Sequence, residues 1–244
     1  MAAGAAAGTQ HDIVRIAHLS FRWPGAGAFS LSISEFRLRA RSRTLLIGPS
    51  GSGKSTFLSL LCGILAPAEG RIEILGRDIS RLSSSARDAF RAEHIGVIFQ
   101  MFNLLPYGTV IDNVVLPLSF APGRRRRVAD AGGPETEAMR LLARLGLPEE
   151  IARGRSVANL SVGQQQRVAA ARALIGAPEL IVADEPTSAL DRNRQLAFLD
   201  LLFEQAKASG ATLVMVSHDE TLGSRFDQVL RLDEILTSGG AVAA

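Results

Sequence analysis

The stretch Gly48-Pro49-Ser50-Gly51-Ser52-Gly53-Lys54-Ser55-Thr56 decides the fold of this 244-residue chain, because it follows the pattern G-x-x-x-x-G-K-[ST] of a phosphate-binding loop. The apolar run 44–47 before it predicts a buried strand. Apolar side chains at helical spacing over 55–65 predict a helix after it. The glycines let the backbone bend around an anion, and the helix N-terminus presents N–H groups to phosphates. This context distinguishes the loop from a Gly/Ser-rich turn that ends in Lys-Ser by chance.

The last residues of the loop indicate its ligand. The Lys54 ammonium can reach the β- and γ-phosphates of a nucleotide, and the Ser55 hydroxyl can bind Mg²⁺. We therefore expect a nucleotide with Mg²⁺ at this loop.

The composition is that of a globular protein and disfavours nucleic acid as a partner. Apolar residues make up 47% of the chain and charged residues 21%, which is not a disordered composition. The net charge is only +3 and aromatic residues are 5%, so neither a strongly basic surface nor a base-stacking platform is predicted. The single cysteine, Cys62, cannot form an internal disulfide, which fits a reducing cytoplasm.

The sequence predicts one domain, over residues 11–235, with no membrane span. Its longest nearly uninterrupted apolar run, 57–66, is far shorter than the roughly 18 residues that a span requires. Residues 1–10 lack a basic start and are expected to be a disordered tail, not a signal peptide. Residues 236–244 are expected to be a second tail of small residues.

Polar side chains follow three predicted buried strands. They are Gln100 after 95–99, Asp184 and Glu185 after 180–183, and His218 after 212–216. The carboxyl ends of parallel strands meet at the ligand-binding edge of an open α/β sheet. Unpaired buried carboxylates are costly, so the acid pair implies a cation, and Mg²⁺ fits a phosphate site. One acid would hold the metal through water and the next would activate a water at the γ-phosphate. An ordinary strand-end glutamine and a structural histidine are the alternatives.

The start of the chain predicts a hairpin that contains the only tryptophan. Residues 13–21 and 29–38 alternate apolar and polar side chains, and Trp23-Pro24-Gly25-Ala26-Gly27 between them has the composition of a turn. Trp23 can stack on a purine or simply cap the hairpin core. The residues alone favour the second interpretation slightly.

Two segments in the middle of the chain leave their roles open. Residues 101–118 are apolar without a clean period, and 103–107 can contact a partner or form a buried loop. Residues 121–134 have the composition of a linker. The run Arg124-Arg125-Arg126-Arg127 within it favours a solvated basic loop over a site for acidic lipid headgroups or RNA.

A second candidate anion site lies before an Ala-rich helix. Leu160-Ser161-Val162-Gly163-Gln164 precedes the strong helix former at 168–174. Ser161 and Gly163 stand where that helix begins, so its first N–H groups can meet an anion.

The order of these motifs resembles the ATP-binding subunit of an ABC transporter, over about residues 13–232. The matching segments are the phosphate loop (Walker A) at 48–56, the Q-loop glutamine Gln100, the signature Leu160 to Gln164, the Walker B strand 180–184 with the catalytic glutamate Glu185, the D-loop Ser188-Ala189-Leu190-Asp191 and the switch histidine His218. Trp23 falls where the family has its adenine-stacking aromatic residue, which favours the purine-stacking interpretation.

The resemblance implies an α/β fold, a P-loop NTPase of the ABC ATPase type. It consists of a mainly parallel RecA-like core sheet flanked by helices, an N-terminal antiparallel β subdomain and an α-helical subdomain inserted at about 101–175. The implied reaction is hydrolysis of ATP with Mg²⁺. Catalysis is assigned to Glu185, His218 and Lys54, and the metal to Ser55, Gln100 and, through water, Asp184.

The resemblance also implies two partners. The signature of a second copy would cover the γ-phosphate, so two copies would enclose two ATP molecules in a head-to-tail dimer. Residues 101–119 would bind an integral membrane protein of the permease type. That partner would hold the chain at the cytoplasmic face of the inner (plasma) membrane.

One departure from the family pattern concerns the signature. Val162 stands where the commonest signature has glycine, but Ser161, Gly163 and Gln164 are kept, so ATP binding need not be lost. This signature and residues 99–106 are similar to subunits of lipoprotein-releasing, macrolide-exporting and cell-division-type systems. In these the membrane partner transmits the ATPase stroke to the periplasmic side.

Two other classes of protein fit the sequence less well. Soluble ABC-type ATPases that act on nucleic acid or ribosomes usually carry two cassettes or long coiled coils, whereas this chain has one phosphate loop, one signature and no sustained heptads. A P-loop kinase or GTPase would lack the signature, and no Asn-Lys-x-Asp motif is present. The cargo is not encoded here, because specificity resides in the membrane partner.

Overall fold

The computed structural model describes residues 11–25, 29–49, 51–153 and 155–237. The tail predicted at 1–10, most of the tail predicted at 236–244, Ser50 of the phosphate loop and part of the turn after Trp23 lie outside these ranges.

The described residues form two five-stranded sheets. The parallel sheet has the order β6-β7-β8-β3-β9 and contains β3 (Arg43–Ile47), β6 (Ile95–Ile98), β7 (Leu180–Asp184), β8 (Thr212–Ser217) and β9 (Gln228–Arg231). The antiparallel sheet has the order β10-β2-β1-β4-β5 and contains β1 (Asp12–Arg22), β2 (Ser30–Arg39), β4 (Glu69–Ile74), β5 (Arg77–Asp78) and β10 (Leu236–Thr237). The predicted parallel core sheet and N-terminal antiparallel sheet are confirmed, and Leu236–Thr237 belong to a strand.

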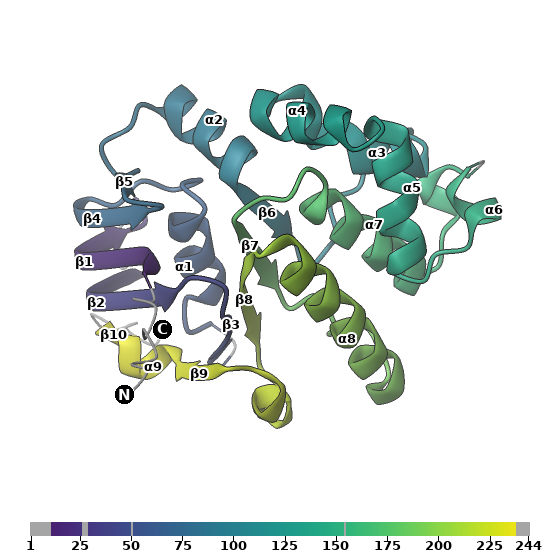
Figure 1. Ribbon diagram of the computed structural model, residues 1–244. Coiled ribbons are helices and arrows are strands. Elements are labelled where there is room, and N and C mark those ends of the chain that lie inside the picture. Colours follow the sequence, from purple (N-terminus) through teal and green to yellow (C-terminus); the bar gives the residue numbers. More distant parts are fainter. Residues whose placement is uncertain (1–10, 26–28, 50, 154, 238–244) are drawn as a thin grey trace, which may run out of the picture.

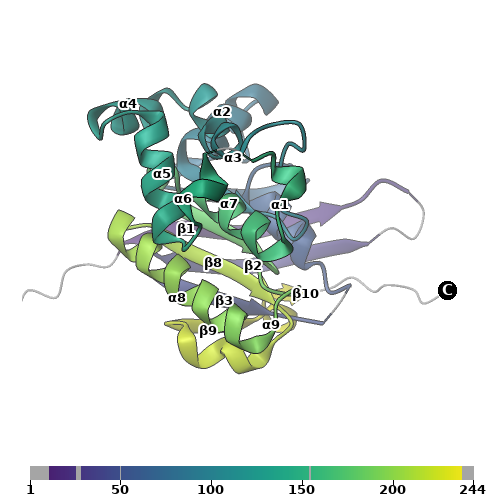
Figure 2. The ribbon, with the colours of Figure 1, turned by 90° about the vertical axis from the view of Figure 1, so that its right-hand side faces the viewer.

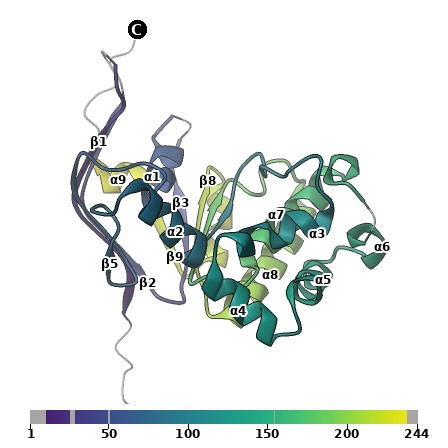
Figure 3. The ribbon, with the colours of Figure 1, turned by 90° about the horizontal axis from the view of Figure 1, so that it is seen from above.

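Helix α1 (Lys54–Leu61) lies between the two sheets (Figures 1 and 3). Successive side chains of a strand point to opposite faces, so each parallel strand contributes to two apolar cores. Leu46, Val182 and Val214 pack with α1 and the antiparallel sheet. Their neighbours, such as Leu45 and Met215, pack with the helices on the other face. This arrangement fixes α1, and with it the phosphate loop, against both sheets.

The other face of the parallel sheet is covered by helices (Figures 1 and 2). Most of them are inserted between β6 and β7 in the sequence: α3 (Val110–Val115), α4 (Pro122–Asp130), α5 (Pro134–Arg144), α6 (Glu149–Ala152) and α7 (Val162–Leu174). Helix α8 (Arg192–Ser209) packs on the same face, whereas α2 (Ser84–His94) and α9 (Leu232–Ile235) contribute Phe90 and Leu232 to the core on the α1 side. Short 3-10 turns lie at Leu116–Ser119, Val157–Asn159 and Glu220–Arg225. Among the residues described, no helix combines the length and apolar character needed to cross a bilayer.

The linker predicted at 121–134 is wrong, because most of it is helix α4. Pro122 occupies the first turn, where its missing N–H is no loss. Arg124 is not in a solvated loop. It is 1% exposed and donates through Nε to Ile175 O at 2.8 Å and through Nη1 to Ala92 O at 3.1 Å. Burial lowers the pKa of Arg124 to about 10. The charged and Gly/Pro-rich composition suggested a linker. The carbonyl groups that accept hydrogen bonds from the buried Arg124 are distant in the sequence, so no local pattern indicates them.

Candidate active site

The phosphate loop connects β3 to α1, and its shape depends on glycine. Gly53, at the N-terminus of α1, has φ +92°, in the left-handed region that glycine adopts without strain. A Cβ atom on Gly53 would also lie 2.5 Å from Cζ of Phe29. Inside the loop, the Ser52 hydroxyl is buried, and no hydrogen-bond partner for it exists in the described part of the chain. Such a donor fits an anion-binding loop.

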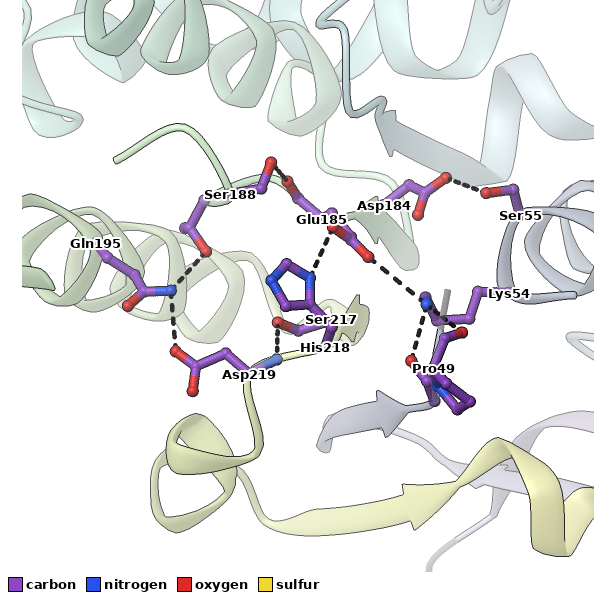
Figure 4. A network of polar contacts seen from close by, with 12 residues as sticks. Pro49, Lys54, Ser55, Asp184, Glu185, Ser188, Gln195, Ser217, His218 and Asp219 are labelled. Carbon is purple, nitrogen blue, oxygen red and sulfur yellow. Dashed lines mark hydrogen bonds and ion pairs between the residues drawn. The ribbon is translucent and has the colours of Figure 1, made fainter. Parts of the chain in front are cut away.

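Lys54 is the first residue of α1 and is 7% exposed. Its Nζ atom donates to the carbonyl oxygens of Gly48 and Pro49, both at 2.8 Å. The same atom lies 3.7 Å from Oε1 of Glu185 (Figure 4). Because a buried ammonium needs compensating partners, these oxygens hold the charge at the mouth of the loop.

Asp184 and Ser55 meet across the edge of the parallel sheet. Asp184 is the last residue of β7, and its Oδ2 accepts a hydrogen bond from Ser55 Oγ at 3.0 Å (Figure 4). Burial raises the pKa of Asp184 above its ordinary value, and the hydrogen bond from Ser55 opposes that rise. The edge predicted from strand ends therefore does place a carboxylate beside the phosphate loop.

A cavity of about 460 Å³ opens beside the loop. Its lining consists of Trp23, Phe29, Gly51, Gly53, Lys54, Ser55, Thr56, Gln100, Asp184 and Glu185. Trp23, 41% exposed, packs edge-on against Phe21 with ring centroids 5.4 Å apart, and its Nε1 donates to Thr56 Oγ1 at 3.4 Å. Trp23 therefore closes the hairpin core and also offers an aromatic surface to the cavity.

The donor set of this cavity fits Mg²⁺. The Ser55 hydroxyl, the Asp184 carboxylate and the Gln100 amide are all oxygen donors, which Mg²⁺ prefers. Within the described ranges, no group of three or more His, Cys, Asp or Glu side chains could hold a metal alone. A Mg²⁺ ion here would therefore share its coordination with phosphate oxygens and water. Gln100 is exposed and stands two residues beyond the end of β6, so it reaches the site from a loop.

Glu185 follows Asp184 and is held in an unusual backbone conformation. Its φ is +43°, and a non-glycine residue in this region costs about 1–2 kcal/mol. Its N–H donates to Val216 O at 3.1 Å, and its carbonyl accepts from Ser188 Oγ at 3.1 Å. Oε2 of Glu185 lies 3.0 Å from Nδ1 of His218, whose ring is exposed (Figure 4). The strained turn thus aims the carboxylate between Lys54 and His218.

The signature lies apart from the phosphate loop of its own chain. Ser161 caps α7, since its hydroxyl accepts from Gln164 N at 3.4 Å and its N–H donates to Gln164 Oε1 at 2.9 Å. Leu160 is buried and Val162 is exposed. None of the residues 160–164 is among those that line the 460 Å³ cavity.

The predicted D-loop lies between the turn that carries Glu185 and α8. Asp191 caps α8 by accepting from Arg194 N at 3.0 Å, and Ser188 and Ala189 are exposed. A Cβ atom on Gly163 would lie 3.9 Å from Cδ2 of Leu190, so the signature and the D-loop are neighbours within one chain.

Two polar residues on α7 contact the candidate site although no sequence motif singles them out. Gln166 donates to Pro186 O at 2.7 Å, directly after Glu185. Arg172 donates to Asn103 O at 2.7 Å and to Phe102 O, shortly after Gln100. Phe102 and Asn103 both have positive φ, so these hydrogen bonds hold a strained segment. The sequence signal that could have identified them is the presence of a glutamine and an arginine on the buried side of an Ala-rich helix.

Comparison with known proteins agrees with this geometry. Residues 31–188 match the family described as ABC transporter. The chain is 39% identical over 224 residues to the lipoprotein-releasing system ATP-binding protein LolD of Novosphingobium aromaticivorans, covering 91% of this chain and 96% of that protein. It is 38% identical over 224 residues to the uncharacterized ABC transporter ATP-binding protein YbbA of Escherichia coli strain K12, covering 91% of this chain and 94% of that protein.

A solved structure shows the same fold. The ATP-binding cassette MJ0796, in a dimeric post-hydrolysis state bound to ADP and Pi, superimposes with a TM-score of 0.78 at 31% identity, over 89% of this chain and 93% of that one. The predicted ABC ATPase fold and ATPase activity are thus confirmed, and a nucleic-acid ATPase is not favoured. The chain belongs to the ABC transporter family, as an ATP-binding and ATP-hydrolysing subunit of the type that includes LolD.

Proposed function

We propose that the chain drives a separate membrane-spanning partner by closing and reopening as a head-to-tail dimer around two ATP molecules with Mg²⁺. The observation that carries this proposal is the separation of the signature from its own cavity. Lys54 and Glu185 line the phosphate-loop cavity and His218 contacts Glu185, whereas Ser161 caps a different helix. The site therefore gains its signature only from a second copy.

Each residue of the cavity has a defined part in ATP binding. Trp23 stacks on the adenine, and the backbone N–H groups of residues 51–56, which lead into α1, surround the phosphates. Lys54 turns from the carbonyls of Gly48 and Pro49 toward the β- and γ-phosphates. Ser55, Gln100 and, through water, Asp184 would hold a Mg²⁺ ion, which would supply positive charge to neutralise the phosphates.

Glu185 and His218 act on the γ-phosphate side. The Glu185 carboxylate accepts a proton from the attacking water, which then attacks the γ-phosphorus as the bond to the ADP oxygen breaks. His218, within hydrogen-bond distance of Glu185, holds the water and the γ-phosphate in line. The partner copy closes the site with its signature and excludes water. Loss of the γ-phosphate contacts after hydrolysis reopens the dimer.

The membrane partner docks on a groove between α2 and the inserted helices. This cavity of about 590 Å³ is lined by residues of α2, β6, the 3-10 turn before α4, the start of α4, and α7. Phe120, in its wall, is 66% exposed, and Met101 and Tyr107 nearby in the sequence are also exposed. Apolar side chains left in solvent support a protein contact here. The docking region thus extends from residues 101–119 to Phe120 and α2, and the partner holds the chain at the cytoplasmic face of the inner membrane.

The test is affinity capture of tagged Glu185→Gln protein with ATP from detergent-solubilised membranes, followed by mass spectrometry. We expect a stoichiometric multi-span protein with a large extracytoplasmic domain, as in systems that release lipoproteins or export substrates by mechanotransmission. Phe120→Asp in the same background should lose that protein and keep ATP binding. Recovery of ribosomal proteins or nucleic acid in place of a membrane protein would contradict the proposal.

A further inference from the structure

Gln166 is a buried polar residue that the mechanism above does not use. It is 1% exposed and lies on α7, about 7.5 Å along the helix axis from the signature residue Ser161. Its Nε2 atom donates to the carbonyl oxygen of Pro186 at 2.7 Å. A buried side-chain amide on an otherwise apolar helix face is costly unless it is hydrogen-bonded, so this contact fixes α7 against the loop after β7.

The loop that Gln166 holds is the turn that carries Glu185. Pro186 directly follows Glu185, whose φ of +43° is strained. Such a conformation persists only where surrounding contacts fix it. Ser188 holds the turn from within through the Glu185 carbonyl (Figure 4). The Glu185 N–H donates to Val216 of β8. Gln166 adds the contact from α7.

The two ends of this contact serve different ATP molecules in the proposed dimer. Glu185 acts on the ATP in its own phosphate loop, whereas Ser161 covers the ATP of the other copy. We propose that Gln166 is a positioning residue that fixes the Glu185 turn of its own chain to the signature helix, and so acts on the ATP site of that chain. This inference rests on the proposed head-to-tail dimer.

A neighbouring residue provides a matched control. Gln165 is also a glutamine on α7, but it is half-buried, and its Nε2 donates to Leu160 O at 3.2 Å, in the signature itself. Gln166 therefore acts on the ATP site of its own chain, and Gln165 on that of the other copy. Loss of the Gln166 side chain should impair the ATP site of its own chain, and loss of the Gln165 side chain should impair the ATP site of the other copy.

The test uses mixed dimers of full-length copies with two different tags, purified in tandem with ATP. In each dimer one copy carries Glu185→Gln, so hydrolysis depends on the other copy's Glu185. Gln166→Leu is placed either on the copy that retains Glu185 or on the copy that carries Glu185→Gln. Single-turnover hydrolysis of bound ATP is compared with that of a reference dimer without Gln166→Leu.

We expect Gln166→Leu to slow hydrolysis about ten- to a hundredfold only when it is on the copy that retains Glu185, because a small misplacement of a catalytic group has effects of this size. Gln165→Leu should show the reverse dependence on placement. Gln166→Met repeats the test if Gln166→Leu does not fold. Equal losses in both placements, or a loss only on the Glu185→Gln copy, would overturn the inference. Failure of Glu185→Gln copies to form any ATP-dependent dimer would instead refute the proposed function.

Discussion

Nδ1 of His218 lies 3.0 Å from Oε2 of Glu185, although the two residues follow different strands and are separated by 33 positions. β7 and β8 are parallel neighbours in the sheet, so the residues after their carboxyl ends meet at one edge. The other carboxylate oxygen of Glu185 faces Lys54. Glu185 thus lies between the Lys54 ammonium and an exposed imidazole, as the proposed activation of water at a γ-phosphate would need.

Replacing His218 should impair chemistry more than binding. We expect His218→Ala to lower kcat about 10²–10³-fold, because the group that orients water and phosphate is removed. ATP affinity should change little, since His218 does not line the phosphate-loop cavity. His94→Ala is the control, because His94, the last residue of α2, also contacts a glutamate, but that glutamate is Glu179, which precedes β7. Steady-state ATPase rates measure the effect, and an unaltered kcat in His218→Ala would remove His218 from the mechanism.

Replacing Lys54 should impair binding itself. Lys54→Ala removes the cation that meets the β- and γ-phosphates, and charge-assisted contacts to phosphate are the strong ones. We expect at least about a tenfold loss of ATP affinity, equivalent to about 1.4 kcal/mol, by isothermal titration. The chain has one other lysine, Lys207 in the last turn of α8, and Lys207→Ala should bind ATP normally. Tight binding by Lys54→Ala would contradict the phosphate-loop assignment.

Trp23 should report directly on nucleotide binding. It is the only tryptophan and lines the cavity, so its fluorescence should change as ATP saturates the protein. Trp23→Ala should weaken ATP binding by about 1–3 kcal/mol, the usual contribution of aromatic stacking on a base. Trp23→Phe should retain most of the affinity. If emission stays constant at saturating ATP, Trp23 only closes the hairpin core through its contact with Phe21.

Arg124 should matter for stability. Arg124→Met leaves the buried carbonyls of Ala173 and Ile175 without their donor, which we expect to lower the free energy of unfolding by about 2–4 kcal/mol. Arg125 is exposed on the same helix, so Arg125→Met should stay within about 0.5 kcal/mol of the unmodified protein. Urea denaturation midpoints provide the comparison. Equal midpoints for the two variants would show that the buried contacts of Arg124 make no net contribution to the free energy of unfolding.

The sequence alone determined the phosphate loop, the order of the motifs and the two kinds of sheet. These features are local: a G-x-x-x-x-G-K-S pattern, buried strands followed by polar residues, and alternating residues before them are legible in short windows. The meeting of Ser55 with Asp184 could also be expected, because parallel strands carry their ends to one edge.

Only the tertiary structure decided which polar residues the apolar core would enclose. Arg124 and Gln166 have ordinary neighbours in sequence, and their acceptors belong to residues 20 to 51 positions away. Composition assigned residues 121–134 to a linker, whereas the structure has helix α4 there, with Arg124 buried and bonded to the carbonyls of Ala173 and Ile175. The strained backbone of Glu185 is likewise held by contacts from other elements. A hydrogen bond between residues distant in the sequence leaves no local sequence pattern, because the packing of the elements determines which groups meet.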